Sequence, residues 1–224
     1  MRRHDLAYLH PGAAYTLTGM APPEAHDALR RWLHAGRPLV VARQPSSGGT
    51  TLFLGLTLPP AGMQPRRLGV SVTLDAVIAI EPPLLLAQCL ETTAPAATID
   101  PLRQLQTRCK RLGVSVHAYG SMAWERLSGM PYRHARSDID LVCDITDACQ
   151  LPGCLDALHT AQLALPCSLD GEIRFAGALA VNWKELARTV QRPATRVVAK
   201  GNASVALVTI NALLASLKEP AHAG

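Results

Sequence analysis

The first third of the chain combines one amphipathic segment with several short apolar runs. Apolar residues recur at helical spacing in PPEAHDALRRWLHAG, which predicts a helix over residues 22–36 that ends at Gly36. Runs of apolar and β-branched residues at 39–42, 50–58 and 68–73 predict strands, and the turn-forming stretch QPSSGG separates the first two runs. These elements predict a small α+β unit.

The pattern is then interrupted by the prolines of IEPPLL and by the small-residue stretch ETTAPAATID. Such stretches are typical of linkers between domains. We therefore predict an N-terminal domain over residues 1–90 and a second domain over residues 91–224.

The second domain shows an alternation of helical and extended patterns. Asp100-Pro101 predicts the start of a helix that ends at Gly113, and residues 155–163 predict another. VSVHAY and DIDLVC predict strands, with the Gly120-Ser121 turn and a short helix between them. Asp170-Gly171 in CSLDGEIRF favours a hairpin turn, and SVALVTINALLASL predicts a terminal apolar helix. The expected fold class is α+β, with a mixed sheet flanked by helices.

Composition excludes several protein classes. The 224 residues are 48% hydrophobic, so the chain can bury its own core, and no apolar run approaches the roughly 18 residues of a membrane span. The N-terminus lacks the apolar core of a signal peptide. Six cysteines are scattered without a C-x-x-C pair, which argues against a zinc site and a disulfide framework. We expect a soluble cytoplasmic protein that does not associate with membranes.

The net charge of +5 comes mainly from arginine, whose planar fork suits phosphate and carboxylate. This charge indicates either an anionic partner or a background of arginine-rich composition, and both interpretations stay open. It is far below the charge of a dedicated nucleic-acid binder, so no nucleic-acid partner is expected.

Two aspartates, Asp138 and Asp140, open the predicted strand DIDLVC. Alternate residues of a strand share a face, so both carboxylates point the same way and repel each other. Magnesium prefers carboxylate and phosphate oxygens and would offset that repulsion. An isolated Asp-x-Asp is, however, more often a solvated strand end than a metal site.

The Gly120-Ser121 pair changes this balance. Glycine lets the backbone approach a ligand closely, and exposed amides together with the serine hydroxyl can hold phosphate oxygens. A strand, a Gly-Ser pair, a short helix and Asp-x-Asp on the neighbouring strand resemble the nucleotidyltransferase superfamily of the DNA polymerase β type. That resemblance implies a polymerase-β-like catalytic domain, two metal ions around a triphosphate, and a third acidic residue on a later strand.

The segment between these elements, WERLSGMPYRHAR, is longer than in most members of that superfamily. GSMAWERLSGMPYRHARSDIDLV together with LDGEIRFAGALAVNWKEL is similar to the family of malonate decarboxylase holo-acyl carrier protein synthases, or phosphoribosyl-dephospho-coenzyme A transferases. The resemblance implies transfer of a prosthetic group from 2'-(5''-triphosphoribosyl)-3'-dephospho-coenzyme A to a serine of the malonate decarboxylase acyl carrier protein, with release of pyrophosphate.

Carried onto this sequence, the resemblance implies that Gly120 and Ser121 position the triphosphate and that Asp138 and Asp140 are catalytic and bind Mg²⁺. We expect Glu172 to be the third carboxylate. The alternative is Asp170, which we expect to shape the hairpin.

Other residues near the motif have less specific interpretations. Arg133, His134 and Arg136 either contact phosphates or form a solvated loop. Trp124 and Tyr132 either line a groove or belong to the core, which is commoner for aromatic side chains. His117 is expected to be semi-buried, and Lys184 and Glu185 match the family pattern without an assigned role.

Two other functions compete with this transfer. One is a nucleotidyltransferase that adds AMP or another nucleotide to a protein or small molecule, which the long Gly-Ser to Asp-x-Asp segment disfavours. The other is a non-catalytic binding module, which the loss of an acidic residue would favour. All candidate acidic residues are present.

Overall fold

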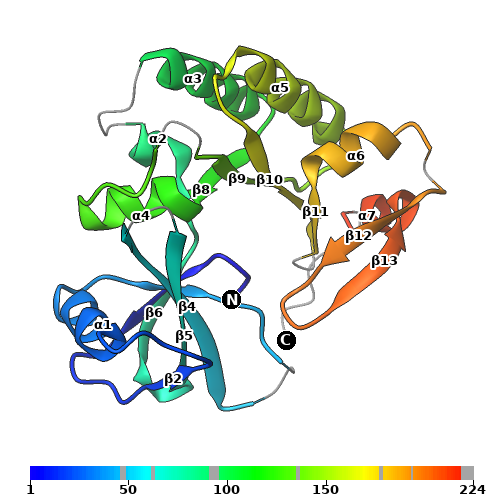
Figure 1. Cartoon of the computed structure of the whole chain (residues 1–224). Helices are drawn as coiled ribbons and strands as arrows, with labels where there is room; N and C mark the ends of the chain where they lie inside the picture. The colour runs from blue at the N-terminus through cyan, green and yellow to red at the C-terminus, as the bar shows by residue number, and fades with distance from the viewer. Residues whose placement is uncertain are drawn as a thin grey trace. The chain divides into compact units, whose positions relative to one another are not determined.

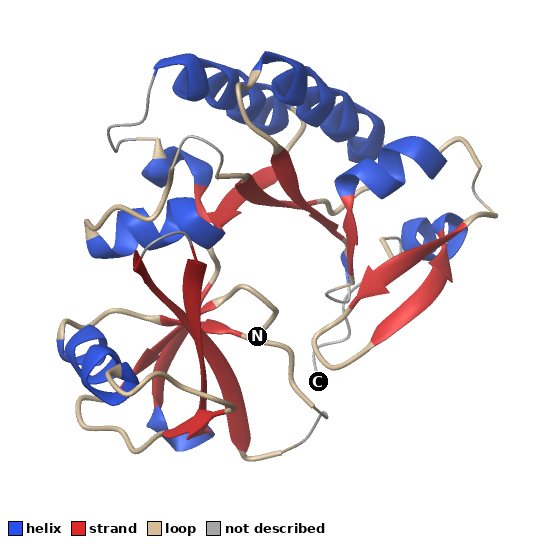
Figure 2. Cartoon of the chain, in the orientation of Figure 1, coloured by secondary structure: helices blue, strands red, loops and turns tan. Residues whose placement is uncertain are grey.

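The computed structural model describes residues 1–217 except 46–48, 62–63, 91–95, 135–136, 177–178 and 193. The chain forms two compact units (Figures 1 and 2). Unit 1 consists of Met1–Pro83 with Leu127–Tyr132 and Asn202–Ser204, and unit 2 contains the rest. Residues 84–90, which were expected in the first domain, lie in unit 2. The expected α+β class is confirmed, with a small N-terminal unit and a larger unit of sheet and helices.

Unit 1 is built on a six-stranded sheet in the order β2-β5-β4-β3-β1-β6. All its strand pairs are antiparallel. The strands are β1 (Leu6–Leu9), β2 (Thr16–Thr18), β3 (Leu39–Val41), β4 (Thr51–Ala61), β5 (Gln64–Thr73) and β6 (Val77–Glu81), with the 3-10 turn η1 (Leu74–Ala76) before β6. Helix α1 (Ala25–His34) buries Leu29 and Trp32, and Trp32 Nε1 donates to the Pro38 carbonyl at 2.9 Å.

Two later segments of the chain complete unit 1. The Tyr132 hydroxyl donates to the Thr57 carbonyl at 2.9 Å, and Asn202 Nδ2 donates to the Met1 carbonyl at 2.8 Å. The backbone N–H of Gln44 also donates to the Asn202 carbonyl. Unit 1 therefore depends on residues far beyond the predicted domain boundary.

Unit 2 is built on a seven-stranded sheet in the order β13-β12-β11-β10-β9-β8-β7. Strands β9 and β10 are parallel, and the other pairs are antiparallel. The strands are β7 (Leu84–Leu85), β8 (Ser115–Tyr119), β9 (Ile139–Asp144), β10 (Leu169–Arg174), β11 (Ala180–Asn182), β12 (Arg196–Lys200) and β13 (Val205–Thr209). The helices are α2 (Leu86–Cys89), α3 (Ala96–Arg111), α4 (Gly120–Ser128), α5 (Gln150–Ala164), α6 (Trp183–Thr189) and α7 (Ile210–Ala215).

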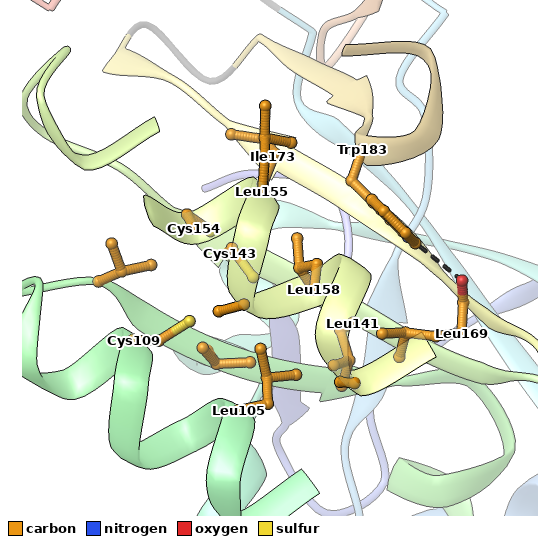
Figure 3. Close-up of a cluster of buried hydrophobic side chains, with 14 of the residues drawn as sticks. Leu105, Cys109, Leu141, Cys143, Cys154, Leu155, Leu158, Leu169, Ile173 and Trp183 are labelled. Atoms are coloured by element: carbon orange, nitrogen blue, oxygen red, sulfur yellow. Dashed lines mark hydrogen bonds between the residues drawn. The ribbon is translucent and has the colours of Figure 1, made fainter. Parts of the chain in front are cut away.

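The core of unit 2 lies on one face of this sheet. Leu105 and Cys109 of α3, Cys154 and Leu158 of α5, and Cys143 of β9 gather there (Figure 3). Because side chains alternate along a strand, burial of Ile139, Leu141 and Cys143 turns Asp140, Val142 and Asp144 to the opposite face. The apolar core therefore fixes which face carries the acidic residues.

The predicted hairpin at Asp170-Gly171 is wrong, because β10 runs through both residues. Gly171 has φ +149°, and a Cβ built on it would lie 2.1 Å from the Leu141 carbonyl oxygen of the paired strand β9. The glycine therefore allows close approach of two strands and does not form a turn.

Two other helices start at residues different from those predicted. Helix α3 starts at Ala96, so Asp100 does not cap it and Pro101 lies within it. The predicted terminal helix begins only at Ile210, because residues 205–209 form β13 and pair with all five residues of β12. Strand β12 was not predicted, and it supplies the partner that turns an apolar run into a strand. None of the helices in the described part of the chain has the length and apolar composition to cross a membrane.

Candidate active site

Asp140 and Asp170 lie opposite each other on parallel strands. Asp140 of β9 is in register with Asp170 of β10, and on its other side with Tyr119 of β8. Paired residues on adjacent strands point to the same face and lie one strand spacing apart, roughly 4.8 Å. Asp138 directly precedes β9 and is exposed. Asp140 and Asp170 thus lie side by side at the start of the parallel pair, and Asp138 comes just before it in the chain.

Gly120 lies against the carboxylate of Asp140. It starts α4 with φ +66°, and a Cβ built on it would lie 2.1 Å from Asp140 Oδ2 and 3.0 Å from Cγ. The carboxylate therefore occupies the space that a side chain at position 120 would fill. Ser121 follows as the second residue of α4 and is half-buried. The first N–H groups of a helix lack intrahelical acceptors and carry partial positive charge, which favours negative groups at this end.

Glu172, the predicted third carboxylate, lies further along the same face. It is in register with Val142, and its Oε1 accepts a hydrogen bond from Lys200 Nζ at 2.9 Å. Its side chain is 4% exposed, so its charge is neutralised within the protein by Lys200. The structure brings Asp170, and not Glu172, directly beside Asp140.

On the same face, a buried ionic network lies at the last residues of β9 and β10. Arg174 Nε and Nη2 donate to Asp144 Oδ1 and Oδ2 at 2.5 and 2.8 Å, and His117 Nε2 lies 3.5 Å from Oδ2. Both Arg174 and His117 are buried. The expected burial of His117 is confirmed, and the network anchors β8, β9 and β10 to one another.

The residues that were expected to contact phosphates have different environments. Arg133 pairs with Glu125 of α4, with its Nε 2.5 Å and its backbone N–H 2.7 Å from the carboxylate oxygens. His134 is exposed and makes two hydrogen bonds with Ser137. The His134 backbone N–H donates to Ser137 Oγ, and the Ser137 backbone N–H donates to the His134 carbonyl. Arg136 lies outside the described residues. The ion pair with Glu125 gives Arg133 an acidic partner within unit 2.

The two aromatic candidates are buried. Trp124 of α4 is 5% exposed, and Tyr132 is 6% exposed. The core interpretation is the one that the structure supports for both residues.

Residues of VNWKEL make hydrogen bonds near the start of β10 and to β12. Asn182 Nδ2 donates to Asp170 Oδ1 at 3.0 Å, and Lys184 Nζ donates to Ser168 Oγ at 3.1 Å. Glu185 accepts from the backbone N–H of Val198 at 3.1 Å. Asn182 was not among the predicted site residues, although an asparagine directly before a helix is a recognised capping signal.

The carboxylates beside Asp140 meet part of the ligand requirement of a magnesium ion. Among the residues that the structure describes, no three His, Cys, Asp or Glu side chains are already gathered into a metal-binding group. Magnesium usually takes one or two carboxylates and completes its shell with water and substrate phosphates, so a full protein cage is not required. The paired carboxylates of Asp140 and Asp170, with Asp138 at the strand end, fit this mode of binding.

Comparisons with known proteins agree with the motifs. Residues 2–83 match the phosphoribosyl-dephospho-CoA transferase MdcG N-terminal domain, and residues 85–211 match the corresponding C-terminal domain. A phosphoribosyl-dephospho-CoA transferase of Xanthomonas euvesicatoria is 32% identical over 212 residues, 94% of this chain and 95% of the relative. One from Bradyrhizobium diazoefficiens is 30% identical over 185 residues, 82% of this chain and 81% of the relative.

No solved structure matches the chain. The sequence matches nevertheless cover both units and confirm the resemblance first seen in the Gly-Ser and Asp-x-Asp motifs. The chain therefore belongs to the phosphoribosyl-dephospho-CoA transferase family and is an enzyme that transfers a group.

Proposed function

We propose that this enzyme attaches the phosphoribosyl-dephospho-CoA group of 2'-(5''-triphosphoribosyl)-3'-dephospho-CoA to a serine of the malonate decarboxylase acyl carrier protein. The serine oxygen bonds to the α-phosphorus of the triphosphate, the bond from that phosphorus to pyrophosphate breaks, and the serine proton passes to the solvent. The pairing of Asp140 with Asp170 beside Gly120 carries this proposal, because it brings carboxylates and helix amides to one point.

Asp138, Asp140 and Asp170 would hold Mg²⁺ at this point. When bound, the ion neutralises charge on the triphosphate and on the departing pyrophosphate. In this proposal Asp170 takes the place for which the sequence suggested Glu172, because Lys200 already binds the Glu172 carboxylate.

Residues of α4 orient the other end of the triphosphate. Gly120 leaves room for the Asp140 carboxylate, and the N–H groups that begin a helix favour a phosphate group at that end. Ser121, as the second residue of the helix, offers its hydroxyl to a phosphate oxygen. Together these groups would place the α-phosphorus for in-line attack.

The test is mass spectrometry of apo acyl carrier protein after incubation with the enzyme, Mg²⁺ and the triphosphoribosyl precursor. The expected result is a mass increase equal to one phosphoribosyl-dephospho-CoA group, located on one serine, with one equivalent of pyrophosphate. Addition of AMP when ATP replaces the precursor, with no reaction of the precursor itself, would instead identify the enzyme as a nucleotidyltransferase of the alternative kind.

A further inference from the structure

Asn182 connects Asp170 to the start of a helix. It ends β11 and caps α6, where its Oδ1 accepts from the backbone N–H groups of Lys184 and Glu185 at 2.9 and 3.4 Å. Its Nδ2 donates to Asp170 Oδ1 at 3.0 Å. Backbone N–H groups only donate and an ionised carboxylate only accepts, so these partners permit one orientation of the amide.

The sheet places Asn182 on the same face as the acidic pair. Asn182 is in register with Glu172 of the antiparallel strand β10, one diagonal step from Asp170. Asp170 is in turn in register with Asp140 of β9. The Asp170 carboxylate therefore lies between a second carboxylate and an amide donor.

The physical role of this amide follows from repulsion between the two carboxylates. Like charges on neighbouring strands disfavour each other, so side-chain rotation would separate Asp170 from Asp140 unless another contact prevents it. A hydrogen bond to one oxygen restrains that rotation and leaves further lone pairs of the carboxylate as acceptors. Glu172 is the contrasting case, because its partner is the Lys200 ammonium group.

We propose that Asn182 is a positioning residue that holds the carboxylate of Asp170 beside Asp140 for binding of a divalent cation. This inference rests on the proposed function, because it concerns the same metal site. Removal of a residue that hydrogen-bonds to a metal ligand typically changes metal affinity by 10- to 100-fold.

Substitutions can separate the positioning role of Asn182 from a purely structural role, which is to cap α6. Asn182→Ser keeps a side-chain oxygen that can cap the helix but removes the amide donor that reaches Asp170. Asn182→Ala removes both contacts. Thr209→Ala is the matched control, since Thr209 caps α7 through a hydrogen bond from the Ala212 N–H at 3.2 Å and has no part in the acidic pair.

The experiment measures binding of Mn²⁺ to the full chain by electron paramagnetic resonance of the free ion, with thermal unfolding of each variant alongside. We expect Asn182→Ser to weaken Mn²⁺ binding by about tenfold or more with little change in the unfolding temperature. Thr209→Ala should lower the unfolding temperature and leave Mn²⁺ binding unchanged. In the transfer assay, Asn182→Ser should raise the Mg²⁺ concentration needed for half-maximal rate, and saturating Mg²⁺ should restore most of kcat.

Asp170→Asn separates failure of this inference from failure of the proposed function. If Asp170→Asn weakens Mn²⁺ binding but Asn182→Ser binds like the wild type, the positioning role is overturned and the metal site stands. If Asp170→Asn also binds like the wild type, the metal site proposed above is overturned as well.

Discussion

The carboxylate of Asp140 occupies the space over the α-carbon of Gly120. A Cβ at position 120 would lie 2.1 Å from Asp140 Oδ2, far inside van der Waals contact. The two residues are 20 positions apart in the chain and meet because β8, which leads into Gly120, is paired with β9. Glycine at this position is thus required by its neighbour as well as by its positive φ.

Gly120→Ala is therefore expected to displace Asp140 and to reduce transfer by on the order of a hundredfold, the effect of misplacing a group in the site. Left-handed backbone costs a non-glycine residue about 1–2 kcal/mol, so the variant should still fold. The measurement is the transfer rate together with the free energy of unfolding.

Gly36→Ala is the matched control for this prediction. Gly36 has φ +67°, almost the same as Gly120, but nothing lies within 4 Å of its built Cβ. It should lose only the about 1–2 kcal/mol that left-handed backbone costs and should keep normal activity. Equal activity of the two variants would show that contact with Asp140 does not matter for the reaction.

Asp138→Asn and Asp140→Asn are each expected to remove nearly all activity without unfolding the chain. Loss of a metal ligand should cost about 3 kcal/mol or more of transition-state stabilisation, on the order of a hundredfold in rate. Stability should change little or rise, because one of two repelling charges is removed. Turnover near the wild-type rate at any Mg²⁺ concentration would argue against a metal role for the substituted residue.

The sequence alone predicted those parts of the candidate site that depend on residues close together in the chain. The spacing of Asp138 and Asp140 and the Gly120-Ser121 pair depend only on residues next to one another, and the structure places all four around the start of β9 and α4. Burial of Ile139 and Leu141, which follows from the alternating pattern, then fixes the direction of the carboxylates.

The sequence alone could not show which acidic residue lies beside Asp140, because that depends on strand register. Asp170-Gly171 has the composition of a hairpin turn, and only the close approach of Leu141 reveals why a glycine stands in the strand. In the same way, Val205–Thr209 became a strand because β12 lies beside it. Pairing between distant segments overrides local propensity in both cases.

Asp170→Asn should mainly reduce activity, and Glu172→Gln should mainly reduce stability. Asp170→Asn should abolish transfer nearly as fully as the Asp140 change. Glu172→Gln removes the partner of Lys200, whose side chain is 34% exposed, so it should lower the free energy of unfolding by about 1–2 kcal/mol. Its effect on the transfer rate should be smaller.

Both variants are compared by single-turnover transfer at saturating Mg²⁺ and by denaturant unfolding. Glu172→Gln as the inactive variant, with Asp170→Asn active, would return the third-carboxylate role to Glu172. The conservative changes keep side-chain size, so differences in packing do not obscure the comparison.

Cys167 offers a chemical test of where the Asp138 carboxylate lies. Burial raises the pKa of the Cys167 thiol, and the negative charge of Asp138 raises it further, while Arg133 opposes the shift. A raised pKa means less thiolate at a given pH and hence slower alkylation. Asp138→Asn removes one of the two causes, so it should lower the Cys167 pKa and speed alkylation below that pKa, although burial keeps it above the usual value.

The measurement is the pH profile of iodoacetamide alkylation at Cys167, followed by peptide mass spectrometry. Cys149 gives an internal control, because a hydrogen bond with Asp147 is the largest cause that raises its pKa. Asp147→Asn should shift the profile of Cys149 and leave Cys167 unchanged, and Asp138→Asn should do the reverse. A Cys167 profile that does not respond to Asp138→Asn would mean that the Asp138 carboxylate does not lie near Cys167, contrary to the structure.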